Sequence, residues 1–219
     1  MRPLVLFGAG ELARLAFLGF TQGGRDVVAC TVSQELVDRT ELFGLPVVAW
    51  EELESSCSPD EHELFVAVGY SGLNRHRASL CEAALARGYG LASHVSPSAI
   101  VASDVEIRQN TFLFEGVVVQ PFVTLGRNVI IWSGAVVSHD SRVGDNCFIA
   151  PRAAIAGNVR LGDNCFVGVN ATIRDGVTVA DDCVIGAGAV VKHDTSRGEV
   201  FSAVATTASE RPSWELERL

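Results

Sequence analysis

The sequence contains no uninterrupted run of about 18 apolar residues, the length at which a helix can cross a membrane. It also has no excess of basic residues: 17 Lys and Arg stand against 26 Asp and Glu, so the net charge is −9. Nucleic acids and anionic membranes attract basic surfaces, and neither is expected as a partner. A small anionic ligand remains compatible with this charge, because single Arg or Lys side chains and backbone N–H groups can bind it.

The 6 cysteines form no CxxC pair, so the usual zinc and redox spacings are missing and no metal site is expected. The first residues, MRPLVLFG, lack the cleavage pattern of a signal peptide. We therefore expect a cytoplasmic location, where cysteines stay reduced. Aromatic residues make up only 7% of the chain, which has 21 glycines, and this composition favours thin repeated layers that leave no room for large rings.

The first 92 residues alternate between short apolar segments and segments with helical spacing. Strands are expected at 3–7, 27–32, 45–48 and 64–69, and helices at 11–20, 50–54 and 74–87. This order predicts a small parallel α/β domain of the Rossmann-like type over residues 1–92. Gly8, Gly10 and Glu11 lie between the first strand and the first helix, where such domains bind phosphate. The same glycines also fit an ordinary tight turn.

An unbroken six-residue repeat replaces this pattern from residue 93 onward. Every sixth residue from Val95 to Val191 is aliphatic, and the residue four positions after each, from Ala99 to Ala189, is small or β-branched. Two unbroken columns of this length predict a parallel β-helix over residues 93–198, in which three hexapeptides close one triangular coil and the aliphatic residues point inward. The tail at 199–219 is expected to pack back on the helix, with Trp214 as an anchor.

Two further columns repeat at steps of 18 residues. Gly126-Arg127-Asn128 recurs as Gly144-Asp145-Asn146 and Gly162-Asp163-Asn164, which predicts one stack of corner turns. Cys147, Cys165 and Cys183 have the same spacing. We interpret them as a buried column of small side chains rather than a metal site.

The chain resembles a known family of enzymes over nearly its whole length. The segments that carry the resemblance are Ile131-Trp-Ser-Gly-Ala-Val-Val-Ser-His-Asp-Ser-Arg-Val-Gly144, Ile155-Ala-Gly-Asn158, Phe166-Val-Gly-Val-Asn-Ala-Thr-Ile173 and Ile185-Gly-Ala-Gly-Ala-Val-Val191. Together with the preceding α/β domain, they resemble the sialic-acid and bacillosamine-pathway family of sugar acetyltransferases. The resemblance implies a left-handed β-helix, a homotrimer with acetyl-CoA between adjacent helices, and acetylation of an amino sugar on a nucleotide carrier for surface glycan synthesis.

Acyl transfer from a thioester needs a base for the attacking group and donors for the oxyanion. His139 suits the role of base, and Asp140 resembles the family's acidic partner, although a surface histidine at a turn is the alternative. By resemblance, the Gly157 N–H group meets the thioester carbonyl, and the backbone at Val169 and Ala187 meets the pantetheine arm.

Charged residues further along the helix have less specific interpretations. Arg174 and Lys192 lie one coil apart and could meet the CoA phosphates, or they could be ordinary solvated charges. His193-Asp194 repeats the His-Asp pair three coils later, too far from the first pair to share an acceptor.

In this family the loop after the first strand and the loop after a later strand hold the nucleotide-sugar. The resemblance thus implies substrate contacts from Gly8, Gly10, Glu11, Tyr70, Asn74 and Arg77. Tyr70 could stack on a base, and Asn74 could instead cap the following helix. The sequence departs from the family at Phe148, where many relatives have a second histidine, at Glu11-Leu12, which replaces Gly-His, and after the second strand, where only Glu35 is acidic.

Several other functions are compatible with parts of the sequence. O-acylation of a sugar would use the same base. A binding protein for CoA or a nucleotide-sugar could keep the fold without the chemistry. A metal-dependent hydratase would need several converging histidines, and the helix offers only His139 and His193 beyond His94. A nicotinamide oxidoreductase would need an acidic residue about 20 positions after the glycines, and the nearest one, Glu35, lies 25 past Gly10.

Overall fold

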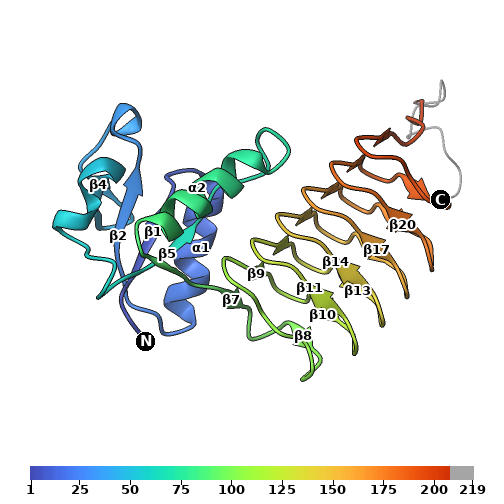
Figure 1. Cartoon of the computed structure of the whole chain (residues 1–219), viewed down its shortest axis with the longest axis horizontal. Helices are drawn as coiled ribbons and strands as arrows, with labels where there is room; N and C mark the ends of the chain where they lie inside the picture. Colours follow the sequence, from blue (N-terminus) through green and yellow to red (C-terminus); the bar gives the residue numbers. More distant parts are fainter. Residues whose placement is uncertain (208–219) are drawn as a thin grey trace, which may run out of the picture.

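The computed structural model describes residues 1–207, and the expected anchor Trp214 lies outside this range. An α/β layer at the N-terminal end lies beside one end of a β-helix that extends away from it (Figure 1). In the described residues, no helix has the length and apolar character needed to cross a membrane.

The α/β layer is built on a sheet with strand order β3-β4-β2-β1-β5-β6. The strands are β1 (Leu4–Phe7), β2 (Val27–Val32), β3 (Glu41–Leu42), β4 (Leu45–Ala49), β5 (Glu63–Val66) and β6 (Gly90–Leu91). All pairs are parallel except β3 with β4, an antiparallel hairpin that the sequence analysis did not predict. Helix α1 (Glu11–Gln22) buries Leu12, Ala16 and Phe20, which share one face at helical spacing.

The second helix and two short 3-10 helices complete this layer. They are α2 (Arg75–Ala86), η1 (Gln34–Leu36) and η2 (Trp50–Ser55). The predicted helix at 50–54 is thus a 3-10 helix. Starting from β1, the chain adds β2 and β4 on one side of the sheet and then β5 and β6 on the other. The direction of winding therefore reverses between β1 and β5.

The β-helix has three faces, each a parallel sheet of two-residue strands, and matches the predicted left-handed β-helix. The aromatic face contains β7 (His94–Val95), β9 (Phe112–Leu113), β12 (Ile130–Ile131), β15 (Phe148–Ile149), β18 (Phe166–Val167), β21 (Val184–Ile185) and β23 (Val200–Phe201). The aliphatic face contains β8 (Ile100–Val101), β10 (Val118–Val119), β13 (Val136–Val137), β16 (Ala154–Ile155), β19 (Thr172–Ile173) and β22 (Val190–Val191). The polar face contains β11 (Thr124–Leu125), β14 (Arg142–Val143), β17 (Arg160–Leu161) and β20 (Thr178–Val179).

The aliphatic column predicted from the sequence forms the core of the β-helix. From Leu113 to Val191, each member is at most 3% exposed. Of the first three members, Val95 is exposed and Val101 and Ile107 are partly buried, because no coil precedes them to complete their packing. Cys147, Cys165 and Cys183 are also fully buried, as predicted. Each Sγ–H group donates to a carbonyl further along the chain, and burial raises the pKa of the Cys147 thiol.

The three faces meet at three corners, each a column of two-residue turns. The His139 corner, between the aliphatic and polar faces, contains 121–122, 139–140, 157–158 and 175–176. The asparagine corner, between the polar and aromatic faces, contains 109–110, 127–128, 145–146, 163–164 and 181–182. The Val169 corner, between the aromatic and aliphatic faces, contains 115–116, 133–134, 151–152, 169–170 and 187–188.

The asparagine corner joins the β-helix to the α/β layer. Its asparagines hydrogen-bond along the helix from Asn110 to Asn128, Asn146 and Asn164, with amide distances between 2.8 and 3.2 Å. Asn110 also bonds both backbone groups of Val66 at the end of β5.

Arg77 of α2 is the central contact at this junction. It is completely buried, and burial lowers the pKa of its guanidinium to about 10. Its Nε donates to Asn128 Oδ1 at 2.9 Å, and Nη2 donates to the carbonyls of Asn128 and Asn146. At the far end of the junction, Arg75 pairs with Asp182 at 2.8 Å.

The last strand lies where the sequence analysis placed the tail. Val200–Phe201 pairs in parallel with Val184–Ile185 and adds a rung to the aromatic face. Here 16 residues separate the paired positions, so the six-residue spacing is lost although the coil continues. The first residues after the predicted boundary at 198 thus pair with the open edge of β21, although the sequence repeat has ended.

We predict that Arg77→Met lowers the free energy of unfolding by at least about 3 kcal/mol, because it leaves buried carbonyl and amide groups without a donor. Arg160→Met on the exposed polar face is the matched control, with an expected change within about 0.5 kcal/mol. Urea unfolding of both variants measures the difference. Equal midpoints would contradict the structural role of Arg77.

Candidate functional site

A cavity of about 630 Å³ lies at the carboxyl ends of β1, β2 and β5. In open α/β sheets this edge, where the winding reverses, is the usual place for a ligand. It is lined by four residues that the sequence analysis proposed as substrate contacts: Gly8, Gly10, Glu11 and Tyr70. The β-helix closes one side with Trp132 and Phe148.

The two glycines of the first loop have different structural surroundings. Gly8 has a φ of +134°, and a Cβ atom there would lie 2.8 Å from the carbonyl oxygen of Ala67 at the end of β5. Gly10 is the N-cap of α1, and a Cβ atom there would meet nothing within 4 Å. The chain packs tightly behind the cavity at Gly8 and leaves space for a ligand near the start of α1 at Gly10.

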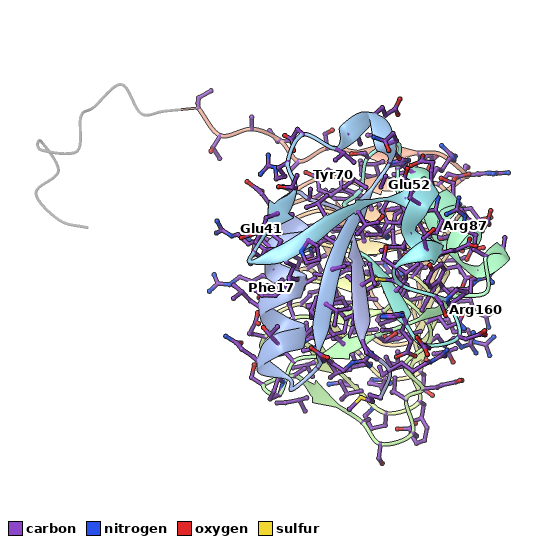
Figure 2. All side chains as sticks on the ribbon, turned by 90° about the vertical axis from the view of Figure 1, so that its left-hand side faces the viewer. Phe17, Glu41, Glu52, Tyr70, Arg87 and Arg160 are labelled. Carbon is purple, nitrogen blue, oxygen red and sulfur yellow. The ribbon has the colours of Figure 1, made fainter. Side chains whose placement is uncertain are left out.

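Tyr70 connects the cavity to the aromatic face of the β-helix. It lies at one end of the N-terminal strands (Figure 2), and its ring centroid is 4.9 Å from that of Phe148 and 4.8 Å from that of Phe166. Tyr70 remains 55% exposed, whereas Phe148 is 4% exposed. Phe148, the departure from the family pattern, is thus a wall residue on the aromatic face and does not lie at the His139 corner.

The structure adds cavity residues that the sequence analysis missed. Ser33, Asp38 and Arg39 follow β2, and His76 lies in the first turn of α2. Arg39 donates two hydrogen bonds to Asp38, at 2.7 and 2.9 Å, and this pairing lowers the pKa of the Asp38 carboxyl. No sequence motif contains these residues. Only their position after β2, at the carboxyl edge of the sheet, could have identified them from the sequence.

Two expected substrate ligands, Asn74 and Arg77, do not lie in the cavity, and this expectation was wrong. Both are fully buried, with side chains committed to the β-helix. Asn74 Nδ2 donates to the carbonyl of Cys165 at 3.2 Å, and its Oδ1 accepts from Arg77 at 3.1 Å. Asn74 occupies the N-cap position of α2, in agreement with the alternative interpretation, although its side chain makes no capping hydrogen bond.

His139 and Asp140 form a hydrogen-bonded pair on the surface of the β-helix. The Nδ1 atom of His139 lies 2.9 Å from Asp140 Oδ2, and both side chains are about half exposed. The backbone N–H of His139 donates to Gln120 Oε1 at 2.9 Å, and its carbonyl accepts from Asn158 N at 3.0 Å. With Nδ1–H donated to the carboxylate, Nε2 carries the lone pair that a general base needs.

Gly157 lies one coil beyond His139 and directly against its ring. A Cβ atom at 157 would lie 2.7 Å from Cε1 and 2.8 Å from Nε2 of His139, and 2.9 Å from Asp175 Oδ1. Any side chain at 157 would therefore displace the imidazole. The absence of a side chain is what allows the imidazole to lie against the backbone of Gly157, which is itself buried.

The other residues expected to bind the cofactor lie at two corners that border the aliphatic face. Val169 and Ala187 are exposed in the Val169 corner. Arg174 and Lys192 are exposed at the edge of the His139 corner, one and two coils past Gly157. The two positive charges thus lie on the same side of the β-helix as His139.

The second His-Asp pair, His193-Asp194, has a different arrangement. Asp194 Oδ1 accepts the backbone N–H of Thr178 at 2.8 Å, so this carboxylate holds the end of the β-helix. The corresponding carboxylate of the first pair, on Asp140, bonds the imidazole of His139.

The cavity and the His139 corner are separate in one chain. Within residues 1–207, the cavity lining includes no member of the His139 corner, because the cavity lies against the aromatic face and that corner lies across the β-helix. A ligand held in the cavity would need a second copy of the chain to bring a His139 to it.

Comparison with models of known protein families matches the β-helix part of the chain. The family model described as bacterial transferase hexapeptide (six repeats) matches residues 104–139 and 140–175, and hexapeptide repeat of succinyl-transferase matches 158–193. Comparison with curated proteins gave no match.

Two kinds of solved structure match nearly the whole chain. The acetyltransferase domain of PglB from Neisseria gonorrhoeae FA1090 is 30% identical, with a TM-score of 0.82, over 91% of this chain and 96% of that chain. A histidine-to-asparagine mutant of perosamine N-acetyltransferase from Caulobacter crescentus, in complex with CoA and GDP-perosamine, is 31% identical, with a TM-score of 0.83, over 90% and 92%. The PglB domain in complex with acetyl coenzyme A has a TM-score of 0.80 at 31% identity, over 91% and 95%.

The resemblance inferred from the hexapeptide segments is thus confirmed over both the α/β layer and the β-helix. With this identity across nearly the full length of these enzymes, the chain belongs to the hexapeptide-repeat sugar acetyltransferases, a family of acetyl-CoA-dependent acyltransferases.

Proposed function

We propose that this protein transfers the acetyl group of acetyl-CoA to the amino group of a nucleotide-linked sugar, with His139 as the general base. The observation that carries the proposal is the His139–Asp140 hydrogen bond with Gly157 packed against the Nε2 edge of the imidazole. Structural relatives of similar length bind CoA and GDP-perosamine, which supports the same classes of donor and acceptor here.

The proposed reaction is a direct transfer. Nε2 of His139 removes a proton from the amine as its nitrogen attacks the thioester carbonyl, and Asp140 stabilises the resulting imidazolium. The Gly157 N–H group donates to the oxyanion. When the intermediate collapses, the C–N bond is kept, the C–S bond breaks, and the imidazolium returns a proton to the leaving thiolate. Arg174 and Lys192 then lie where the phosphates of CoA would extend along the helix.

The proposed substrate site is the cavity of the α/β layer. Its volume suits a nucleotide-sized ligand. The open space at Gly10 allows a diphosphate to approach the N-terminus of α1. Tyr70 offers a half-exposed ring for a base. We assign this role to residues 1–92 and the acetyl-CoA site to the β-helix that follows. All 6 cysteines are free and buried, which is compatible with the proposed cytoplasmic location.

The working form is proposed to be a homotrimer. The outward side chains of the aliphatic face are Ile100, Val118, Val136, Ala154, Thr172 and Val190. Ile100 and Val190 are 68% and 56% exposed, so this face is apolar and uncovered in one chain. It lies between the His139 corner and the Val169 corner. Threefold packing of this face would bring the His139 corner of one copy beside the Val169 corner and the cavity of the next.

We predict that purified protein releases thiol from acetyl-CoA with at least one UDP-, GDP- or dTDP-linked amino sugar, and that His139→Ala lowers this rate by more than about 100-fold. Binding of acetyl-CoA to His139→Ala, measured by calorimetry, should persist. A rate that survives the substitution would remove His139 from the mechanism. Release only with hydroxyl acceptors would make the protein an O-acetyltransferase.

Gly157→Ala should reduce kcat by about 10- to 100-fold, because the added methyl group pushes the imidazole away from its position beside Asp140. Gly144→Ala is the matched control, since a Cβ atom there meets backbone of Gly162 at 2.7 Å and lies at a different corner. It should lower the melting temperature but leave kcat of the folded enzyme within about twofold. If both variants keep kcat, the close packing at Gly157 has no catalytic role.

Val136→Arg on the aliphatic face should convert the trimer to monomers and abolish transfer, because it buries a charge in the proposed interface. Thr124→Arg makes the same change on the exposed polar face and should leave the trimer intact. Light scattering measures the mass of both variants. A monomeric wild type would contradict the trimer.

A further inference from the structure

Two corner residues of the β-helix break the rule that the other corners follow. The second residue of each corner turn has a left-handed backbone, with φ between 53° and 73°. Asparagine, aspartate and glycine tolerate this conformation, and they occupy nearly all of these positions. In the described part of the chain the exceptions are Phe122, with a φ of 66°, and Arg152, with a φ of 58°.

Phe122 gains little within its own chain for adopting this conformation. It is 70% exposed, more than most large apolar side chains of the described residues. It does not belong to the apolar clusters that form the core, although its backbone N–H is held by Asp104 Oδ2 at 2.7 Å. A bulky residue in a left-handed conformation is strained, and such strain is found where function requires the side chain.

Phe122 is a direct neighbour of the candidate catalytic pair. Its turn, Pro121-Phe122, lies one coil before His139-Asp140 in the same corner, about 4.8 Å away along the helix. The two turns are in contact, because Asp140 N donates to Pro121 O at 3.3 Å and His139 N donates to the side chain of Gln120. Gly157 lies one coil beyond His139, on the side away from Pro121-Phe122, and is buried against the imidazole.

We propose that Phe122 contacts the acceptor sugar and orients its amine toward Nε2 of His139. The proposal rests on the function proposed above. In that arrangement the acyl donor approaches along Gly157, and the acceptor arrives from the other side of the imidazole, where Phe122 presents its ring. A pyranose has C–H bonds on its faces that pack well on a flat aromatic ring, and an exposed ring at this site supplies that surface. Phe122 is thereby a specificity-determining residue that the family motifs do not identify.

Three substitutions distinguish the effect of the aromatic ring from the effect of the backbone strain. Phe122→Asn removes the ring and relieves the strain, Phe122→Leu removes the ring and keeps the strain, and Phe122→Tyr keeps both. The KM for the amino-sugar acceptor should rise about tenfold in the Asn and Leu variants and stay within twofold in Tyr. The KM for acetyl-CoA should stay within twofold in all three.

Stability should follow a different order. Phe122→Asn should raise the melting temperature by about 2–4 °C, whereas the Leu and Tyr variants should not. Arg152→Asn, which relieves the same strain at the Val169 corner, calibrates that shift. All variants should keep the mass of the wild type by light scattering.

The outcomes are distinguishable. An unchanged acceptor KM in both the Asn and Leu variants, with an active wild type, would overturn the role of Phe122 and leave the proposed function standing. Loss of the trimer in these variants would assign Phe122 to the interface between copies and overturn its contact with the sugar. A wild type that acetylates no amino sugar would overturn the proposed function and this inference with it.

Discussion

The column of asparagines at one corner of the β-helix determines how the two parts of this protein fit together. Successive asparagine side chains bond one another along the helix, and two of them also bond the α/β layer: Asn110 bonds Val66, and Asn128 bonds Arg77. The side chains of Asn110 and Asn128 are buried and would be costly to leave unpaired, which fixes the position of the layer on the helix. The cavity consequently has one wall from each part, and the aromatic face is the face that the layer covers.

This docking leaves the other two faces with different properties. The polar face presents Arg142 and Arg160 to solvent, whereas the aliphatic face presents Ile100 and Val190 without a cover. His139 lies at the corner between these two faces and away from the cavity. A single chain therefore contains both halves of the proposed transfer site without bringing them together. In the proposed trimer, burial of the uncovered aliphatic face would drive association, and the same contact would complete the site.

The sequence predicted the fold well where a fixed period determines the direction of each side chain. The aliphatic and cysteine columns are buried as expected, and the His139–Asp140 pair projects from the surface. Arg77 was misassigned because residue type and helix position do not reveal a partner such as Asn128, 51 residues away. Asp38 and Arg39 were missed because the segment after β2 has no period, and only the folded sheet brings it to the cavity.

Columns that support the β-helix repeat one residue type, and the column beside the proposed chemistry does not. Equal residues stack well on their own kind: Gly126, Gly144 and Gly162 allow close approach of successive coils, and Cys147, Cys165 and Cys183 fill equal spaces. The corner column that contains His139 instead reads Pro121, His139, Gly157, Asp175 and His193. A regular ladder would place a side chain where the imidazole of His139 now lies against Gly157. The proposed chemistry thus lies in a corner column that departs from uniform stacking, the arrangement that stability alone favours.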